Sequence, residues 1–427
     1  MPDYKKRKRN KILSKPKPQK KSRAKALENY DIKMSSGLKK NEYSKASNIK
    51  VIEGRRLENK KRFKATTITV ILVTVAVLIV NSVLPAGILQ SAKTAVKLIG
   101  AGSFPISLES SQTVNTVRVG NYYYVLGDTY LCAVSNGGKL LFNYQHGFEK
   151  PVLKTSNAGA LVYNQGSKEF LLFDIYGLKN SYTAEKNILT ANISDSGNYV
   201  LATVSDKYAS AVTVYKKNGK KLYEWFSAED TVNNVALSKN GRKLAVSVFN
   251  SKNGEFSSKI NVFNFKSATP LYSESFEKGL IYNIDTSFST AFAVITENKV
   301  KVIKWGSFKF KEYKNDYTLS ILKPTPNGYV AVFNRQSDKT DNRIAILGRN
   351  GKTKKEIVYS GIISDIDVNG SHIYCMSDTE ITTVTIEGQI KQKTVFGFGG
   401  VNVCATSSNA VTVITDSKIE KVKLVKE

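Results

Sequence analysis

Five acidic residues stand at equivalent tight turns between strand-like segments, in the sequences LGDT, VSDK, TENK, MSDT and TDSK. They are Asp128, Asp206, Glu297, Asp378 and Asp416. If the segments repeat in space, the acids lie on one face, where a ring of carboxylates could attract a cationic ligand. Aspartate is also a good turn residue, because its carboxylate bonds its own backbone. The turn role is the simpler interpretation, and we favour it.

Two connections are longer than the others, FNSKNGEFSSK at residues 249–259 and NRQSDKTDNR at residues 334–343. Loops held by a rigid scaffold often carry binding residues. Phe256, Arg335 and Arg343 are therefore the candidate binding residues in these two segments. Simple tolerance of insertions explains the extra length equally well.

Catalytic and metal-binding signatures are missing from the chain. It has no GxSxG elbow, HExxH motif, P-loop or EF-hand loop. The two histidines are His146, in a QHGFEK connection where we expect a solvated side chain, and His372, in a strand-like SHIYC run where a structural role is expected. We predict no catalytic residue, no metal site and no cofactor. Carboxylates that converge from distant strands remain an alternative.

The three cysteines, Cys132, Cys375 and Cys404, each lie in an apolar strand-like run. A sparse, odd-numbered set in a domain of this size is not a disulfide framework. We expect all three to be small buried residues.

The segments that carry these residues repeat. From residue 104 onward apolar residues alternate with polar ones, and Gly, Asn, Asp and Ser interrupt the pattern. This is typical of short strands joined by hairpins. Two kinds of turn recur together at a period of about 41 residues, within the range for a four-stranded propeller blade. The first kind is found at Gly120, Gly159, Gly197, Gly241, Gly328, Gly370 and Asn409, with a degenerate copy near Ser289.

The repeat predicts an all-β protein, a β-propeller of eight four-stranded blades over residues 104–427. Seven blades result if the copy near Ser289 is not a repeat. The last unit supplies only three strands before the chain ends, and the spare segment FPISLES (104–110) precedes the first unit. We predict that this segment is the outermost strand of the last blade, which closes the ring and removes exposed sheet edges.

A charge-free stretch precedes the propeller. Residues 65–84 are long and apolar enough for a transmembrane helix, and residues 85–103 form a neck. Residues 1–64 hold 23 Lys and Arg against 6 Asp and Glu, a net of +17. Cations next to a span resist translocation, so the N-terminus is predicted to be cytoplasmic and the propeller extracytoplasmic in the cell membrane. A cleaved signal peptide is the rival interpretation, but its apolar region is usually shorter.

The basic tail, residues 1–64, is too polar to form a core, and we expect it to be disordered. Attraction to anionic lipid is the simpler role for its charge. Nucleic acid is an unlikely partner because the tail lacks interleaved aromatic residues and is tethered to a membrane.

The GK-containing turns and the SDSG step resemble those of the quinoprotein-like and WD-type propeller superfamily. The WD dipeptide, the adjacent cysteine pair and the tryptophan-rich docking motif are missing, so no redox activity is implied. The layout also resembles an uncharacterised family of single-pass, membrane-anchored propellers of Gram-positive bacteria.

Three functions fit these features. The first is a binding or scaffolding module for an envelope protein, a peptide or a wall polymer. The second is a polysaccharide lyase or hydrolase with carboxylates in the central channel. The third is a transmembrane signalling protein, ranked last because the tail has no folded effector domain.

Overall fold

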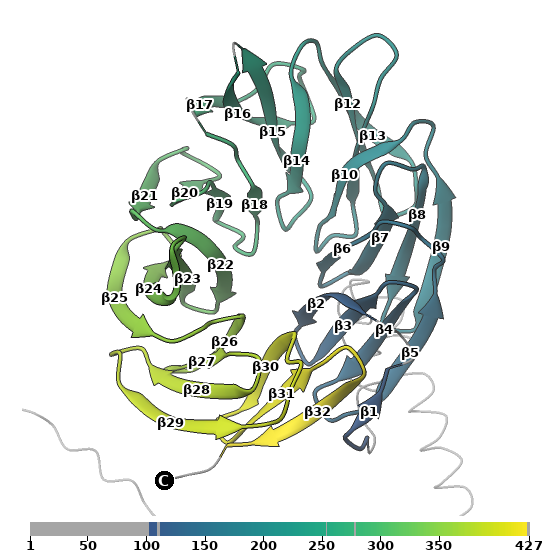
Figure 1. Cartoon of the computed structure of the whole chain (residues 1–427). Helices are drawn as coiled ribbons and strands as arrows, with labels where there is room; N and C mark the ends of the chain where they lie inside the picture. Colours follow the sequence, from purple (N-terminus) through teal and green to yellow (C-terminus); the bar gives the residue numbers. More distant parts are fainter. Residues whose placement is uncertain (1–101, 109–111, 253, 277–278, 425–427) are drawn as a thin grey trace, which may run out of the picture. The chain divides into compact units, whose positions relative to one another are not determined.

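The computed structural model describes residues 102–108, 112–252, 254–276 and 279–424. The predicted tail (1–64), transmembrane helix (65–84) and most of the neck (85–101) lie outside them. Within the described ranges, no helix is long and apolar enough to cross a bilayer. These ranges form eight antiparallel four-stranded sheets, which confirms the all-β propeller and resolves the blade number as eight (Figure 1).

Each blade is a simple up-and-down sheet whose first strand is innermost. Blades 1 to 4 consist of β2 (Thr113–Val119), β3 (Tyr122–Gly127), β4 (Tyr130–Ser135), β5 (Leu140–Gln145); β6 (Pro151–Ser156), β7 (Gly159–Asn164), β8 (Glu169–Asp174), β9 (Gly177–Thr183); β10 (Ile188–Ile193), β11 (Tyr199–Thr203), β12 (Ser210–Tyr215), β13 (Lys221–Ser227); β14 (Thr231–Leu237), β15 (Lys243–Lys252), β16 (Glu255–Asn264), β17 (Tyr272–Phe276).

The second half of the ring follows the same pattern. Blades 5 to 8 consist of β18 (Asn283–Asp285), β19 (Ala291–Ile295), β20 (Lys299–Lys304), β21 (Phe310–Lys314); β22 (Thr318–Thr325), β23 (Gly328–Arg335), β24 (Asp338–Gly348), β25 (Thr353–Ser360); β26 (Asp365–Asn369), β27 (His372–Met376), β28 (Glu380–Thr385), β29 (Ile390–Val395); β30 (Asn402–Ser407), β31 (Ala410–Ile414), β32 (Lys418–Lys423) and β1 (Ile106–Ser107).

The ring closes as the sequence predicts. The short strand β1 pairs antiparallel with β32, with Ile106 opposite Ile419. The Leu108 N–H extends the ladder by donating to the Ser417 carbonyl at 2.8 Å. Phe104, Ile106 and Leu108 pack against the apolar cluster between blades 8 and 1. The first segment of the propeller therefore seals the last sheet.

The core lies between blades rather than within one layer. Successive side chains of a strand point to opposite faces, so each second strand supplies two interfaces. Tyr123 is fully buried between blades 8 and 1, and Tyr124 is fully buried between blades 1 and 2. This double burial explains the nearly unbroken apolar character of the middle strands.

Strand direction sorts the turns into two faces. The turns between first and second strands lie on one face, here called the funnel face. The turns between second and third strands, and the connections between blades, lie on the opposite face, here called the hairpin face. The recurring glycines have positive φ in the funnel-face turns. At Gly328 a Cβ would lie 1.9 Å from the Leu347 carbonyl oxygen, so only glycine fits.

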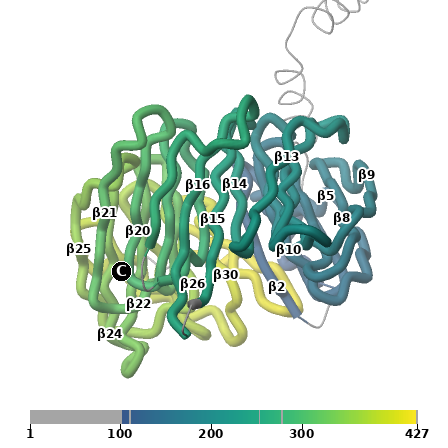
Figure 2. The backbone as a smooth tube through the Cα atoms, turned by 90° about the horizontal axis from the view of Figure 1, so that it is seen from above, coloured from purple at the N-terminus to yellow at the C-terminus, as the bar shows by residue number. Residues whose placement is uncertain are grey.

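The two long connections are not loops. They continue the strands β15 and β16 as far as the pair Lys252–Glu255, and the strands β23 and β24 as far as Arg335–Asp338. An antiparallel ladder needs only backbone groups to continue, so polar side chains do not stop it. Both hairpins project on the hairpin face, and the β23–β24 hairpin extends at the lower left of Figure 2.

Candidate functional site

A cavity of about 710 Å³ lies at the centre of the funnel face. We call it the funnel. The ends of the innermost strands and the turns after them line it, from each of blades 1 to 7. Four cationic side chains and three carboxylates face it: Arg118, Lys154, Lys239, Lys323, Asp195, Asp285 and Asp367.

Arg118 and Asp367 join three blades at the funnel wall. The Arg118 Nη1 donates to the Ala405 carbonyl at 2.7 Å, and the Ala405 N–H donates to Asp367 Oδ2 at 2.7 Å. The guanidinium and the carboxylate are 3.5 Å apart. Both charged groups are therefore occupied in holding β2, β26 and β30 together.

Lys323 is the second cation with an acidic partner. Its Nζ lies 3.7 Å from Asp365 Oδ1, and Asp365 Oδ2 accepts the Val403 N–H at 3.0 Å. Burial acts to lower the pKa of Lys323, but the nearby charges of Asp365 and Asp367 outweigh burial and raise it above its ordinary value. Lys323 is accordingly held as a paired cation.

Two further carboxylates of the funnel also have partners. Asp195 lies 3.3 Å from the Lys239 Nζ and accepts the Asn157 N–H at 3.0 Å. Asp285 accepts a hydrogen bond from the Tyr329 hydroxyl at 2.8 Å. These bonds cross from one blade to the next, so the carboxylates serve the packing of the ring.

Lys154 differs from the other three cations. It stands near the end of β6 and lines the funnel, and among the described residues no carboxylate lies within ion-pair distance of its Nζ. Burial lowers the pKa of Lys154 below its ordinary value, and no neighbouring charge offsets that effect. An ammonium without a counterion in a concave, partly desolvated site is suited to receive an anionic group.

The predicted acidic turns lie on the hairpin face, and each contacts a neighbouring segment. Asp206 pairs with Lys186 of the preceding connection at 2.7 Å, and this hydrogen bond lowers the pKa of Asp206. Asp416 accepts the N–H of Thr113, the first residue of blade 1, at 2.8 Å. In these two turns the carboxylate holds the adjacent connection or the adjacent blade.

The remaining acidic turns follow the same pattern. Asp378 accepts the Gly399 N–H at 3.2 Å, and Glu297 accepts a hydrogen bond from the Gln336 side chain at 3.4 Å. Asp128 bonds through its backbone N–H to the Gln112 carbonyl at 3.1 Å. The five acids share a face but not a common site.

The structure brings two of the three predicted hairpin residues together. Arg335 and Arg343 both pair with Asp341 at 2.9 Å, and both guanidinium groups lie about 5 Å from the ring centre of Tyr317. The hydrogen bond from the Tyr317 hydroxyl, reinforced by both arginines, lowers the pKa of Asp341. Phe256 stands on the other hairpin, 48% exposed, and does not join this cluster.

Both histidines contact neighbouring residues of the propeller. His146 is half-buried rather than solvated, because its Nδ1 accepts the Phe148 N–H at 3.0 Å and its Nε2 faces the Gly127 carbonyl at 3.3 Å. His372 stacks near Tyr374 in β27. The three cysteines are buried and free, as predicted, and burial raises the pKa of each thiol to about 12. In the described part of the chain no three His, Cys, Asp or Glu side chains gather to hold a metal ion.

Sequence reasoning did not find Lys154. A signal was available, because charged residues are rare in the innermost strands, and those strands have one side toward the central channel. Arg118, Lys154, Lys323, Asp365 and Asp367 all interrupt such strands. Which of them has no counterion depends on contacts between blades, which spacing along the chain does not give.

Comparison with known proteins gives a family without an assigned activity. Residues 104–424 match the model described as "Family of unknown function (DUF5711)". No curated protein matches. Among solved structures, apo AztD from Citrobacter koseri has a TM-score of 0.49 at 13% identity, covering 73% of this chain and 90% of that chain.

Two further structures are similar at the same level. A chain of the mitotic checkpoint complex has a TM-score of 0.47 at 8% identity, covering 77% of this chain and 92% of its own length. The Cps50 (Swd1) β-propeller domain of Myceliophteria thermophila has a TM-score of 0.43 at 10% identity, covering 66% and 98%. Identities this low say nothing about a shared function.

Proposed function

The chain belongs to the DUF5711 family, and we propose that its propeller is a binding module whose funnel receives an anionic group of an extracellular peptide or wall polymer. The fold itself is one that serves binding or scaffolding. The observation that carries the proposal is the ammonium of Lys154, which lines the funnel without an acidic partner among the described residues.

The other charges of the funnel support the choice of an anion. Arg118, Lys239 and Lys323 each lie within 4.0 Å of a carboxylate, and those pairs also hold backbone or side-chain groups of neighbouring blades. A cationic ligand would have to compete for these occupied carboxylates. An anionic ligand meets Lys154 without breaking any existing pair, and charge-assisted bonds to carboxylate or phosphate are strong.

Catalysis by funnel carboxylates has weaker support. Asp285 and Asp367, and Asp365 behind them, accept hydrogen bonds from hydroxyl or backbone donors of adjacent blades. These bonds give each carboxylate a role in packing the ring, whereas a general acid or base has to be within hydrogen-bond reach of the proton that it transfers. Binding is therefore the function that this geometry favours.

The proposed location follows from the sequence alone. The apolar segment 65–84 would anchor the chain in the cell membrane with the basic tail in the cytoplasm. The propeller would then stand outside the membrane, where peptides and wall polymers rich in carboxylate or phosphate are accessible. The span also gives the binding module a fixed attachment.

Isothermal titration of the full-length protein in detergent micelles tests the proposal, with inorganic phosphate and a tetraglutamate peptide as probes. We expect at least one probe to bind, and Lys154→Met to weaken that binding tenfold or more. The matched control is Lys217→Gln, which removes an exposed lysine from an outer turn of the same face. Absence of binding by both probes, or equal binding by the Lys154 variant, would contradict the proposal.

A further inference from the structure

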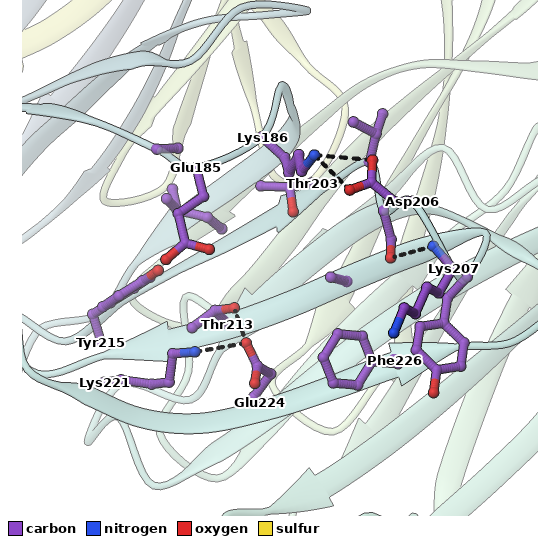
Figure 3. A pocket seen from close by; sticks show the side chains of 16 residues that line it. Glu185, Lys186, Thr203, Asp206, Lys207, Thr213, Tyr215, Lys221, Glu224 and Phe226 are labelled. Atoms are coloured by element: carbon purple, nitrogen blue, oxygen red, sulfur yellow. Dashed lines mark hydrogen bonds and ion pairs between the residues drawn. The ribbon is translucent and has the colours of Figure 1, made fainter.

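A second cavity, of about 310 Å³, runs along the flank of blade 3 where this blade faces blade 2. We call it the flank cleft (Figure 3). Its floor is formed by β11 and β12, and one wall is the connection from β9 to β10. The size falls at the lower end of the range of about 300–1,000 Å³ that is usual for small-ligand pockets.

A cluster of aromatic rings limits the cleft. Phe170, Tyr182 and Tyr199 pack against one another between the two blades, with ring centres 5.2, 5.7 and 6.4 Å apart, and Tyr215 stacks on Tyr199 at 5.1 Å. These rings fill the interface up to Tyr215, which lines the cleft. The lining continues from Tyr215 along β12 through Thr213 and Ala211.

The far end of the cleft carries an exposed aromatic pair. Tyr208 and Phe226 are 44% and 42% exposed, and their ring centres are 4.9 Å apart. An exposed apolar patch rimmed by polar residues is a feature of ligand-binding grooves. The face of an aromatic ring carries partial negative charge, so it attracts the C–H groups of a flat, weakly polar ligand surface.

The charged lining is balanced. Three carboxylates and three ammonium groups face the cleft: Glu185, Asp206, Glu224, Lys186, Lys207 and Lys221. Four of them form two ion pairs, Lys186–Asp206 at 2.7 Å and Lys221–Glu224 at 2.8 Å. Figure 3 shows these pairs on opposite sides of the cavity, with Phe226 beside the second.

This lining selects against a charged ligand. Its six charges sum to zero, four of them are already paired, and the two outside the pairs, Glu185 and Lys207, have opposite signs. A neutral ligand with many hydroxyl groups can add to them, because a paired carboxylate keeps free lone pairs and a paired ammonium keeps free N–H donors. The hydroxyls of Thr203 and Thr213 add donors and acceptors of the same kind.

We propose that the flank cleft binds a neutral saccharide unit, with the sugar's C–H face on Tyr208 and Phe226 and its hydroxyls on the charged lining. A peptide that binds by strand addition fits less well, because such a peptide gains its affinity from a free backbone edge and the walls of this cleft are side chains on the face of a sheet. The proposal is independent of the funnel and of its anionic ligand.

The test uses the full-length protein in a detergent without a sugar head group. Chitotetraose, cellotetraose and mannotetraose are titrated and followed by saturation-transfer NMR and calorimetry. We expect one of them to bind, and Phe226→Ala and Tyr208→Ala each to weaken that binding tenfold or more. Both rings are well exposed, so the variants should keep the thermal unfolding midpoint of the wild type.

Two control variants separate this site from others. Phe398→Ala removes a ring that is 84% exposed on the connection after β29. Lys154→Met changes the funnel. Both variants should bind the saccharide as the wild type does. The proposal is overturned if none of the three oligosaccharides binds, if the aromatic variants bind as the wild type does, or if Phe226 is required only for binding a peptide. If Phe226→Ala loses saccharide binding but keeps phosphate binding, the flank cleft and the funnel are separate sites.

Discussion

Arg118 of β2 and Asp367 of β26 approach to 3.5 Å across the backbone of a third strand. The Arg118 guanidinium donates a hydrogen bond to the carbonyl of Ala405, and the Asp367 carboxylate accepts one from the N–H of Ala405. Blades 7, 8 and 1 meet at this point, and the strand β1 closes blade 8 at the outer edge of its sheet. The polar wall of the channel and the closure of the ring therefore depend on the same three blades.

Asp367→Ala should lower the free energy of unfolding by about 1–3 kcal/mol, because it leaves the Ala405 N–H, buried in the channel wall, without an acceptor. Urea denaturation followed by circular dichroism measures the change. Asp338→Ala, at an exposed hairpin end, is the control and should lose much less stability than Asp367→Ala. Equal values for the two variants would show that the contact between blades contributes nothing.

Gly328→Ala should lower the free energy of unfolding more than Gly120→Ala does. Both residues have positive φ, which costs a non-glycine residue about 1–2 kcal/mol. At Gly328 a Cβ would also meet the Leu347 carbonyl at 1.9 Å, whereas nothing lies within 4 Å of it at Gly120. The thermal unfolding midpoints of both variants measure the difference. A larger loss of stability for Gly120→Ala would mean that the close approach to the Leu347 carbonyl does not determine the effect of the substitution.

His146 should make stability fall in mild acid. Burial lowers its pKa below the ordinary value near 6.5, so the unfolded chain takes up a proton before the folded one does. The stability is fully present above that ordinary pKa and is lost as pH falls from it toward the lower folded pKa. Protonation of Nδ1 would also displace the Phe148 N–H.

The measurement is the unfolding midpoint in urea between pH 7.5 and 5 for the wild type and for His146→Gln. The wild type should lose more stability across this interval than the variant loses. Parallel curves would show that His146 has the same proton affinity in the folded and unfolded chain.

Much of the fold could be predicted because its signals are local. Six of the turns between first and second strands contain a glycine with positive φ, from Gly120 to Gly370. Together with Asn409 these glycines mark seven of the eight blades in the sequence. The closing strand was also predictable, because residues 104–110 have apolar alternation and the last unit lacks a fourth strand. Strand lengths were harder to predict. The hairpins at Phe256 and Arg335 are paired through backbone groups, which the amino-acid composition does not reveal.

The candidate sites depended on contacts that the spacing does not specify. The acids at Asp206, Asp378 and Asp416 share a sequence pattern, but their partners come from the adjacent connection or blade. Lys154 and Lys323 look alike in sequence, each near the end of an innermost strand, and only Lys323 meets a carboxylate. Charge balance in a channel is a property of eight strands together.

The most direct test of the account is the pH dependence of anion binding by the funnel. Because burial lowers the pKa of Lys154, phosphate or tetraglutamate affinity should fall as pH rises, at a pH below the value near 10.4 of an ordinary lysine. Lys154→Arg, which stays charged throughout, should bind across the same range without that fall. Wild-type binding that stays constant up to the ordinary lysine pKa, or no binding by either protein, would contradict the central claim.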